Sequence, residues 1–552
     1  MPLTYLDICL GALAAYFLRK LAEKPRRALP PGPRPYPIIG NLLDVAVGRA
    51  WLKYLLFKEK YGPITCLKVF GMNIMILNSL DDAIELFDKR SAIYSDRPRL
   101  VFGGEMCGWS NTLALLRDVE EHRLHRKNIH RVIGTRAATS KFHSLMEVEM
   151  RRLVLRIMKR PDLLQQHVQT SATALILRIS HGYSIEPEGS DPLVDIAEKG
   201  VSQISMAAQP GAFLVDALPV CEYKSTTEIE ETIMSNICST VQYVPDWMPG
   251  AGFKRTAKYF KETVTELVER PFAFVKHQML YGCAGSSYTR ELLEVSDGTP
   301  EFEHMVKWSA SSLYTGGAET SVGTIQTFFL AMLLNPEVVK KAQQEIDTAI
   351  ISDRLPTFED RGKLPYINAI CQETKRWHSI SPMGLPHVST QDDIYRGYLI
   401  PKGSIILPNI YGFAQDPQRY KRPSEFIPER FIGGDRYGGK PAETDVDEFT
   451  FGFGRRICPG NHLADATLFI VAAISLAVFD FKYAKDPDGQ DIIPKFEFVP
   501  GTLTHPVQFK SGCAPRSEKA ARLILSVQEE HPWTSSDPQV LSSIDWKNLA
   551  TE

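Results

Sequence analysis

Residues 451–460 read FGFGRRICPG and hold one cysteine, Cys458, between an arginine pair and a Pro-Gly turn. A free cysteine is most often a small buried core residue, and a glycine-rich turn can arise by chance. The next run, NHLADATLFIVAAISLAVF, is apolar and helical in character, and Pro459 suits a first helical turn. We therefore expect the Cys458 sulfur at a helix N-terminus, where the positive end of the helix dipole favours the thiolate that a soft metal bond requires.

The rest of this loop suits a flat, acidic cofactor. Gly452 and Gly460 let the backbone pass close to such a group, and Arg456 can direct a cation at one of its carboxylates. Because the pattern FxxGxRxCxG fixes many positions, we favour a metal ligand over a plain core cysteine.

The composition is that of a folded globular protein. The chain has 552 residues, 44% of them hydrophobic and 23% charged, and a formal net charge of −2. A charge so near zero leaves no electrostatic footprint for nucleic acid. The nine cysteines include no CxxC pair, which argues against a disulfide framework or a structural zinc site and suits a reducing, cytosol-facing compartment.

The N-terminus predicts membrane attachment. Residues 3–18 are apolar apart from Asp7, and basic residues follow them. Since the positive charge follows the apolar run, we expect residues 1–28 to be a signal anchor in the endoplasmic reticulum membrane, a transmembrane helix with the body in the cytosol. The run is short against the ~17–25 residues of a span, so an amphipathic helix lying on the membrane is the alternative. The proline-dense stretch 30–37 would form a stiff connector.

No second linker or repeat follows, so we expect residues 29–525 to form one large domain, mainly α with small β-sheets. Periodic apolar segments predict helices over 76–90, 118–134, 140–182, 253–280, 301–334, 335–350 and 362–378. Short β-type runs lie at 64–70, 73–78, 395–400 and 404–408. The tail, residues 526–552, is expected to be loosely ordered.

The Cys458 loop resembles the haem-binding loop of the microsomal, fungal-type members of the cytochrome P-450 superfamily of haem-thiolate monooxygenases, and three further motifs follow the family's order. Glu373 and Arg376 match its E-x-x-R pair, although such a pair alone is usually a surface ion pair. The segment 426–431, FIPERF, resembles the one whose arginine, here Arg430, completes a buried structural network with them.

The third motif is GGAETS at 316–321, inside the helix expected over 301–334. Glycine in mid-helix costs ~1 kcal/mol relative to alanine, so two of them usually have a reason. By resemblance, Gly316 and Gly317 let haem and dioxygen approach the backbone, and Glu319 and Thr320 are the acid–alcohol pair that delivers protons. A glycine-softened packing face is the alternative.

The resemblance implies haem b with Cys458 as the axial ligand of its iron and with Phe451, Gly452 and Gly460 against it. It further implies that Arg456, His387 and Arg126 hold the propionates. The sequence departs from the family at His122, where tryptophan is usual. A histidine can also donate to a propionate, but its charge depends on pH.

The implied activity is insertion of one oxygen atom of O2 into a hydrophobic small molecule, in secondary metabolism. The chain has no G-x-G-x-x-G motif opening a βαβ unit, so electrons from NADPH would come through a separate NADPH-cytochrome P-450 reductase, with cytochrome b5 as a second candidate donor. By resemblance the pocket includes parts of 98–116, 200–220, 309–317, 380–386 and 499–505, with apolar side chains.

Two other functions stay open. A reductase-independent haem-thiolate isomerase or dehydratase needs no acid–alcohol pair, so Glu319 and Thr320 count against it. A non-catalytic or degenerate haem-binding protein gains weight from His122 and from residues 221–240. This polar segment separates two stretches that run together in the fungal members, and it is either a loop insertion near the substrate entrance or a retained intron, which transcript sequencing would distinguish.

Overall fold

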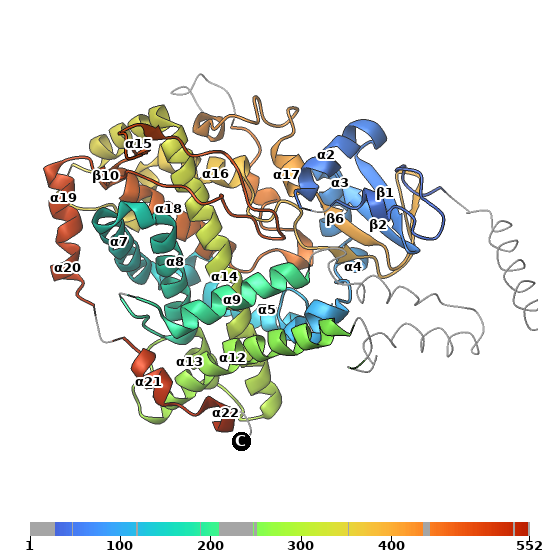
Figure 1. The fold of residues 1–552 in the computed structure, drawn as a ribbon, viewed down its shortest axis with the longest axis horizontal. Coiled ribbons are helices and arrows are strands. Elements are labelled where there is room, and N and C mark those ends of the chain that lie inside the picture. The colour runs from blue at the N-terminus through green and yellow to red at the C-terminus, as the bar shows by residue number, and fades with distance from the viewer. Residues whose placement is uncertain are drawn as a thin grey trace, which may run out of the picture.

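Helix α14, Pro300–Leu334, runs through the middle of the molecule (Figure 1). Thr299 caps it by accepting a hydrogen bond from the Phe302 N–H, and Pro300 occupies the first turn, where a proline loses no hydrogen bond. The helix packs against α8, Leu164–His181, and α18, Asn461–Val478. The predicted helix over 301–334 is therefore the central element of the core.

The computed structural model describes residues 28–549 apart from 47, 118–119, 188, 209–246, 248–250, 352, 434–441 and 534–535. Residues 1–27 of the expected anchor and the segment 221–240 lie outside the described residues. Among those described, α18 has the length and hydropathy of a membrane span, and so does the bent pair of α14 with α15, Pro336–Ala349, if taken as one. Most of α18 is buried inside the protein, as is typical of a core helix.

Most of the described chain is helical. The longer helices besides α14, α8, α15 and α18 are α2 (Ala50–Tyr61), α5 (Glu120–Ile133), α7 (His143–Lys159), α9 (Pro192–Ala207), α12 (Gly252–Leu280) and α16 (Pro365–Trp377). The shorter α-helices are α3 (Leu80–Ile84), α4 (Ser91–Tyr94), α6 (Arg136–Ser140), α13 (Tyr288–Leu293), α17 (Ile410–Ala414), α19 (Glu518–Leu525), α20 (Val527–Glu530), α21 (Pro538–Ser543) and α22 (Trp546–Leu549).

The β-structure is small, and its main sheet lies at one side of the helices (Figure 1). The main sheet has the order β1 (Ile64–Val69), β2 (Met72–Leu77), β6 (Ile405–Pro408), β3 (His387–Val388). The β2–β6 pair is parallel and the other pairs are antiparallel. Two-stranded pairs are formed by β4 (Asp393–Tyr395) with β5 (Tyr398–Ile400), β7 (Phe479–Asp480) with β10 (Ala514–Pro515), and β8 (Ala484–Lys485) with β9 (Asp491–Ile492). The mainly α class with small sheets is confirmed.

Three element predictions were wrong in detail. The helix predicted over 140–182 is two helices, because Arg160 leaves the helical conformation before Pro161. The helix predicted over 76–90 overlaps β2 and begins only at α3, which Ser79 caps. The strand predicted over 395–400 is interrupted by the turn that joins β4 to β5. Arg396 and Gly397 in this turn both take positive φ, 49° and 81°, as a tight two-residue hairpin turn requires.

The tail differs from the expected loose order. Helices α19 and α20 pack against α7, and α21 and α22 lie against α12 (Figure 1). Leu541 and Ile544 are buried in the main core. Trp533 lies under the guanidinium groups of Arg152 and Arg156, 4.1 and 4.7 Å from its ring centroid. Hydrophobic burial and cation–π contacts hold this segment on the domain.

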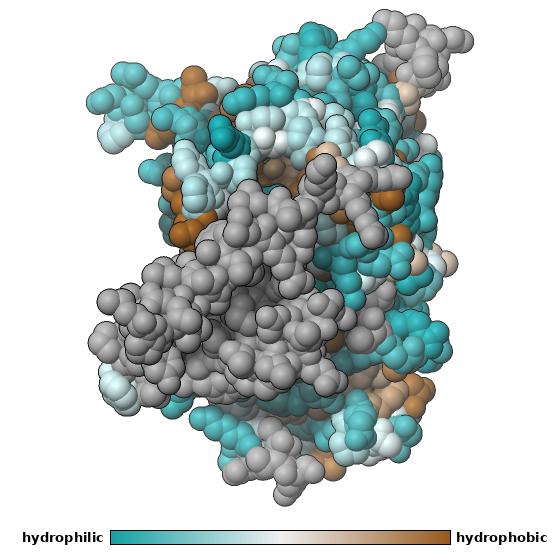
Figure 2. All heavy atoms as spheres, turned by 90° about the vertical axis from the view of Figure 1, so that its right-hand side faces the viewer, coloured by the Kyte–Doolittle hydropathy of each residue, from teal (hydrophilic) through white to brown (hydrophobic). Residues whose placement is uncertain are grey.

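The surface is mixed. On the face shown in Figure 2, hydrophilic residues predominate among the described ones, and hydrophobic residues gather in small separate patches. Scattered apolar side chains of this kind are normal on folded proteins.

Candidate active site

The cysteine loop is held by its own backbone. The Cys458 N–H donates to the Phe451 carbonyl at 2.7 Å. Gly454 has φ +49°, and a Cβ there would stand 2.2 Å from the Phe87 carbonyl oxygen, so no larger residue fits. Helix α18 begins at Asn461, with Gly460 as its N-cap. Pro459 thus precedes the helix, and the prediction that it lies in the first turn was wrong.

The Cys458 side chain is exposed, although many protein atoms lie around it. Burial raises the pKa of this thiol, while the Gly460 N–H and the Arg126 cation act in the opposite direction. The Gly460 N–H at the helix N-terminus acts in the direction expected from the sequence, and desolvation of the charged form opposes it. Bonding to a metal ion would deprotonate the thiol.

The two glycines of α14 face different surroundings. A Cβ on Gly316 would meet no heavy atom within 4 Å, so this position faces open space. A Cβ on Gly317 would stand 3.0 Å from Cδ1 of Ile176 on α8. Adjacent helical residues are rotated by about 100°, and for this reason only Gly316 leaves room for a flat group. Gly317 packs closely against α8, and its predicted cofactor contact stays a prediction.

The residues expected to deliver protons follow one turn later. The Thr320 hydroxyl donates to the Gly316 carbonyl at 2.7 Å. Oε1 of Glu319 lies 2.9 Å from Nε2 of His505. Burial raises the pKa of Glu319, but the hydrogen bond and charge of His505 more than offset it, and the net pKa is below the usual range. Sequence reasoning placed residue 505 only within the expected pocket segment 499–505 and did not single out His505, which lies in a loop without periodicity.

Arg126 and Arg456, which are expected at the propionates, share one region with His122 and Arg97. Arg126 Nη1 donates to the Ile457 carbonyl at 2.6 Å, and Arg456 Nε donates to the Ser95 carbonyl at 2.7 Å. Arg97, which sequence reasoning missed, donates from Nη1 to the carbonyls of Pro386 at 2.7 Å and Leu385 at 3.1 Å. The sequence around Arg97, SDRP at residues 95–98, has no pattern that distinguishes a buried arginine from an exposed one.

The two histidines there are held neutral. Burial, followed by Arg456, Arg126 and Arg97, lowers the pKa of His122 to about 3. Burial and the same Arg97 and Arg456 charges hold the pKa of His387 well below its usual value. Nδ1 of His387 lies 2.7 Å from the Tyr94 carbonyl oxygen. Since a carbonyl oxygen only accepts hydrogen bonds, Nδ1 carries the hydrogen and donates it. Without an acidic ligand, His122 does not change charge across neutral pH.

This cluster fits haem. Burial, followed by the Arg456 charge, lowers the pKa of Arg97 to about 9. Asp96 partly offsets Arg97, and it also pairs with Arg117 at 2.9 Å. Two propionate carboxylates would balance the remaining positive charge. Cys458 can supply the iron ligand, and the open space at Gly316 leaves room for the flat group.

The three charges of the E-x-x-R network meet in the core. Arg376 Nε and Nη2 lie 2.7 and 2.8 Å from the two carboxylate oxygens of Glu373. Arg430 Nε lies 3.1 Å from Glu373 Oε2. Side-chain exposure is 0% for Glu373 and Arg376 and 2% for Arg430, so this is no surface ion pair.

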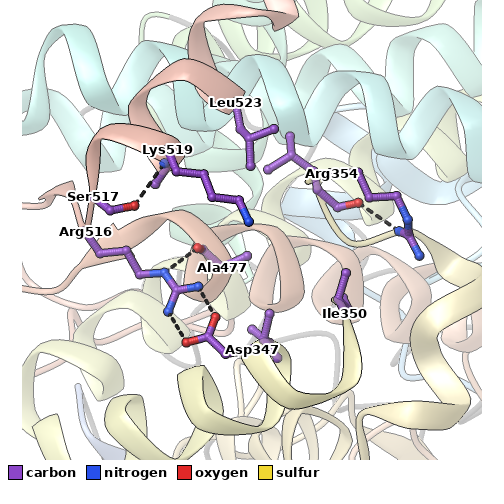
Figure 3. Close-up of a pocket in the computed structure, with 11 residues that line it drawn as sticks. Asp347, Ile350, Arg354, Ala477, Arg516, Ser517, Lys519 and Leu523 are labelled. Carbon is purple, nitrogen blue, oxygen red and sulfur yellow. Dashed lines mark hydrogen bonds and ion pairs between the residues drawn. The ribbon is translucent and has the colours of Figure 1, made fainter. Parts of the chain in front are cut away.

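A separate cavity of about 320 Å³ lies between α15, α18 and α19 (Figure 3). Its Arg516 pairs with Asp347, Nη1–Oδ2 2.9 Å, and its Arg354 pairs with Asp360 at 2.7 Å. Ala477, which lines it, is near the C-terminal end of α18, whereas Cys458 precedes the N-terminus, about 25 Å away at 1.5 Å per residue. This cavity is thus not part of the site.

The comparisons with known proteins agree on one family. The family model described as Cytochrome P450 matches residues 30–511. Cytochrome P450 monooxygenase claR of Ampulloclitocybe clavipes is 44% identical over 528 residues, covering 96% of this chain and 94% of its own. Cytochrome P450 monooxygenase ppsD of Aspergillus oryzae is 40% identical over 96% of this chain and 98% of its own. The O-methylsterigmatocystin oxidoreductase of Aspergillus flavus is 37% identical over 98% of both.

Proposed function

The chain belongs to the cytochrome P450 family and is a monooxygenase, and we propose that it oxidises a hydrophobic secondary metabolite with electrons from an NADPH-dependent reductase. The observation that supports this most is the position of Arg126, which lies near the Cys458 sulfur and shares one region with the buried Arg97 and Arg456. When bound, haem b would supply dioxygen activation and electron transfer.

The residues of this chain have separate tasks in the proposal. Cys458 ligates the iron, and Arg97, Arg126 and Arg456 hold the propionates, with His122 and His387 as neutral neighbours. Glu319 and Thr320 hold and move protons beside the open face at Gly316. The Glu373–Arg376–Arg430 network keeps α16 and the following segment in place.

The substrate proposal rests on the wall residues that are described. Leu313 is buried, and Ile380, Met383, Leu385 and Leu503 are half-buried. Such side chains favour an apolar molecule selected by shape. One relative is named for O-methylsterigmatocystin, which supports a secondary metabolite as the substrate class.

We place the enzyme at the endoplasmic reticulum membrane with its catalytic domain in the cytosol. This rests on the apolar run 3–18 and the basic residues after it. Deleting residues 1–28 should release the protein from the membrane fraction, and a deletion variant that stays bound to membranes would contradict the anchor.

The decisive experiment is the carbon monoxide difference spectrum of the reduced, full-length protein in membranes. We expect the strongly red-shifted Soret band of thiolate ligation, and we expect Cys458→Ser to lose it. A reductase should then support NADPH oxidation that rises with selected hydrophobic compounds. A thiolate band without reductase-dependent NADPH oxidation would point to the isomerase or dehydratase alternative. No haem binding at all would contradict the proposal.

A further inference from the structure

The acid of the proton-delivery pair has a partner from a distant part of the chain. Nε2 of His505 lies 2.9 Å from Oε1 of Glu319, with side-chain exposures of 23% and 17%. The two groups are close enough for a hydrogen-bonded ion pair. Their partial exposure lets water reach the pair, while most of each side chain is shielded.

The surrounding backbone holds His505 against α14. The Val499 N–H donates to the His505 carbonyl at 2.8 Å, and the Thr504 N–H donates to the Ile380 carbonyl at 2.9 Å. A Cβ on Gly323 would stand 2.8 Å from Nδ1 of His505 and 2.0 Å from Cδ1 of Ile380. The absence of a side chain at Gly323 is therefore what allows the imidazole to lie on the helix.

Other polar groups face the pair from the neighbouring elements. Gln169 on α8 hydrogen-bonds Glu319. Glu198 on α9 faces Glu319, and Asp195 acts on Glu198 in turn. His378, at the end of α16, faces His505 and is also near Arg49. Glu198 is thus a like charge beside Glu319, whereas His505 is a basic partner that pairs with it.

We propose that His505 is a positioning residue for Glu319, which it holds in one orientation beside Thr320 and supplies with protons. In this step the imidazolium form of His505 loses its Nε2 proton to the Glu319 carboxylate, so an N–H bond breaks and an O–H bond forms at Oε1. Glu319 passes that proton on and is a carboxylate again. The neutral imidazole then takes up a proton from bulk water, and no electrons are exchanged. This inference rests on the proposed monooxygenase function, in which Glu319 delivers protons.

The test needs no identified substrate. Full-length variants are loaded with haem, combined with the reductase and given NADPH and air, and hydrogen peroxide released per NADPH oxidised is measured from pH 6 to 8. Slow proton delivery favours two-proton reduction of O2 to peroxide over four-proton reduction to water. His505→Leu removes the imidazole, and His505→Gln keeps a donor that does not titrate. His167→Gln is the matched control, since that half-buried ring hydrogen-bonds the Arg160 carbonyl at 3.0 Å and not Glu319.

We expect His505→Leu to raise the peroxide yield several-fold, with an unchanged carbon monoxide band. His505→Gln should also raise the yield, because an amide can hold Glu319 but cannot supply it with a proton, and His167→Gln should match the unmodified enzyme. An unchanged yield and pH profile in His505→Leu would overturn the relay.

The pairing itself is tested without catalysis. Melting temperatures of Glu319→Gln, His505→Leu and the double variant form a cycle, and we expect the double shift to be smaller than the sum of the single shifts. Additive shifts would overturn the pairing. An unmodified enzyme that oxidises no NADPH would instead overturn the proposed function and the relay with it, while the melting cycle would still report on the pair.

Discussion

Glu373 and Arg376 stand one turn apart on α16 and form a two-pronged ion pair with both side chains fully buried. Arg376 also donates from Nη1 to the carbonyls of Ala414 at 3.0 Å and Pro423 at 2.7 Å. The Ile427 N–H donates to Glu373 Oε1 at 2.8 Å. The pair therefore links α16 to the backbone that follows α17, and each charge depends on the other.

Removing one member should be costly. Glu373→Gln would leave Arg376 as a buried charge without its counter-ion, and we expect a loss of about 3–5 kcal/mol in the free energy of unfolding. Urea unfolding checks this value. The matched control is Glu425→Gln, whose partner Arg422 is also three residues away but exposed, and its loss should stay below about 1 kcal/mol. Equal losses in the two variants would contradict the burial argument.

Arg97 should matter for haem retention although the sequence does not single it out. Arg97→Gln removes a cation from the cluster with Arg126 and Arg456, and we expect haem content per protein to fall several-fold. Absorbance at the Soret band against total protein measures this. Arg99→Gln, two residues away at an exposed pair with Glu105, should keep full haem content. Full occupancy in Arg97→Gln would remove Arg97 from the propionate site.

Buried neutral histidines should make the fold sensitive to acid. Burial lowers the pKa of His181 to about 3, whereas the unfolded chain titrates near 6.5. Between these values the unfolded state binds the proton and the folded state does not, so stability falls as the pH is lowered. From pH 7.5 to 5.5 this residue alone should cost about 1.4 kcal/mol.

His181→Leu tests this contribution, because leucine does not titrate. Urea unfolding at pH 7.5 and 5.5 should show a difference smaller by that amount than in the unmodified protein. An identical pH dependence in both proteins would show that His181 is protonated in the folded state or stays neutral in the unfolded one.

The docked tail should contribute to stability. Leu541 is 2% exposed in the main core, and Leu541→Ala should cost about 2–5 kcal/mol through lost burial and the cavity left behind. Thermal unfolding checks this. Ser543→Ala on the same short helix is the control, since its exposed hydroxyl only bonds the Val540 carbonyl. A neutral Leu541→Ala would mean that the tail is not held as described.

Prediction from sequence worked where the pattern was long and local. The helices near 253–280, 301–334 and 335–350 follow from extended apolar periodicity, which reflects one buried face. The same reasoning predicted one continuous helix across Arg160 and Pro161, where the structure has two separate helices, α7 and α8. It also missed the tail, because α21 and α22 are too short to show a period and are ordered by contacts with α12.

The candidate site divides in the same way. Cys458, Glu319, Thr320, Glu373 and Arg376 lie in motifs with fixed spacing, and the motifs predicted them. Gly316 and Gly317 are neighbours that the motif could not separate, since their roles depend on which side of α14 faces α8. Arg97 and His505 stand in ordinary loops, where burial and partners leave no trace in the adjacent residues.

The sequence by itself determined the chemistry available at the cysteine loop and the family to which the chain belongs, because one thiol, permissive glycines and spaced charges carry that information locally. Only the tertiary structure decided which charges meet. Glu319 reaches His505 because Gly323 leaves room for an imidazole from a distant loop, and the arginine cluster forms because three separate segments pack together. Such meetings depend on packing between segments far apart in the chain, and no local pattern records them.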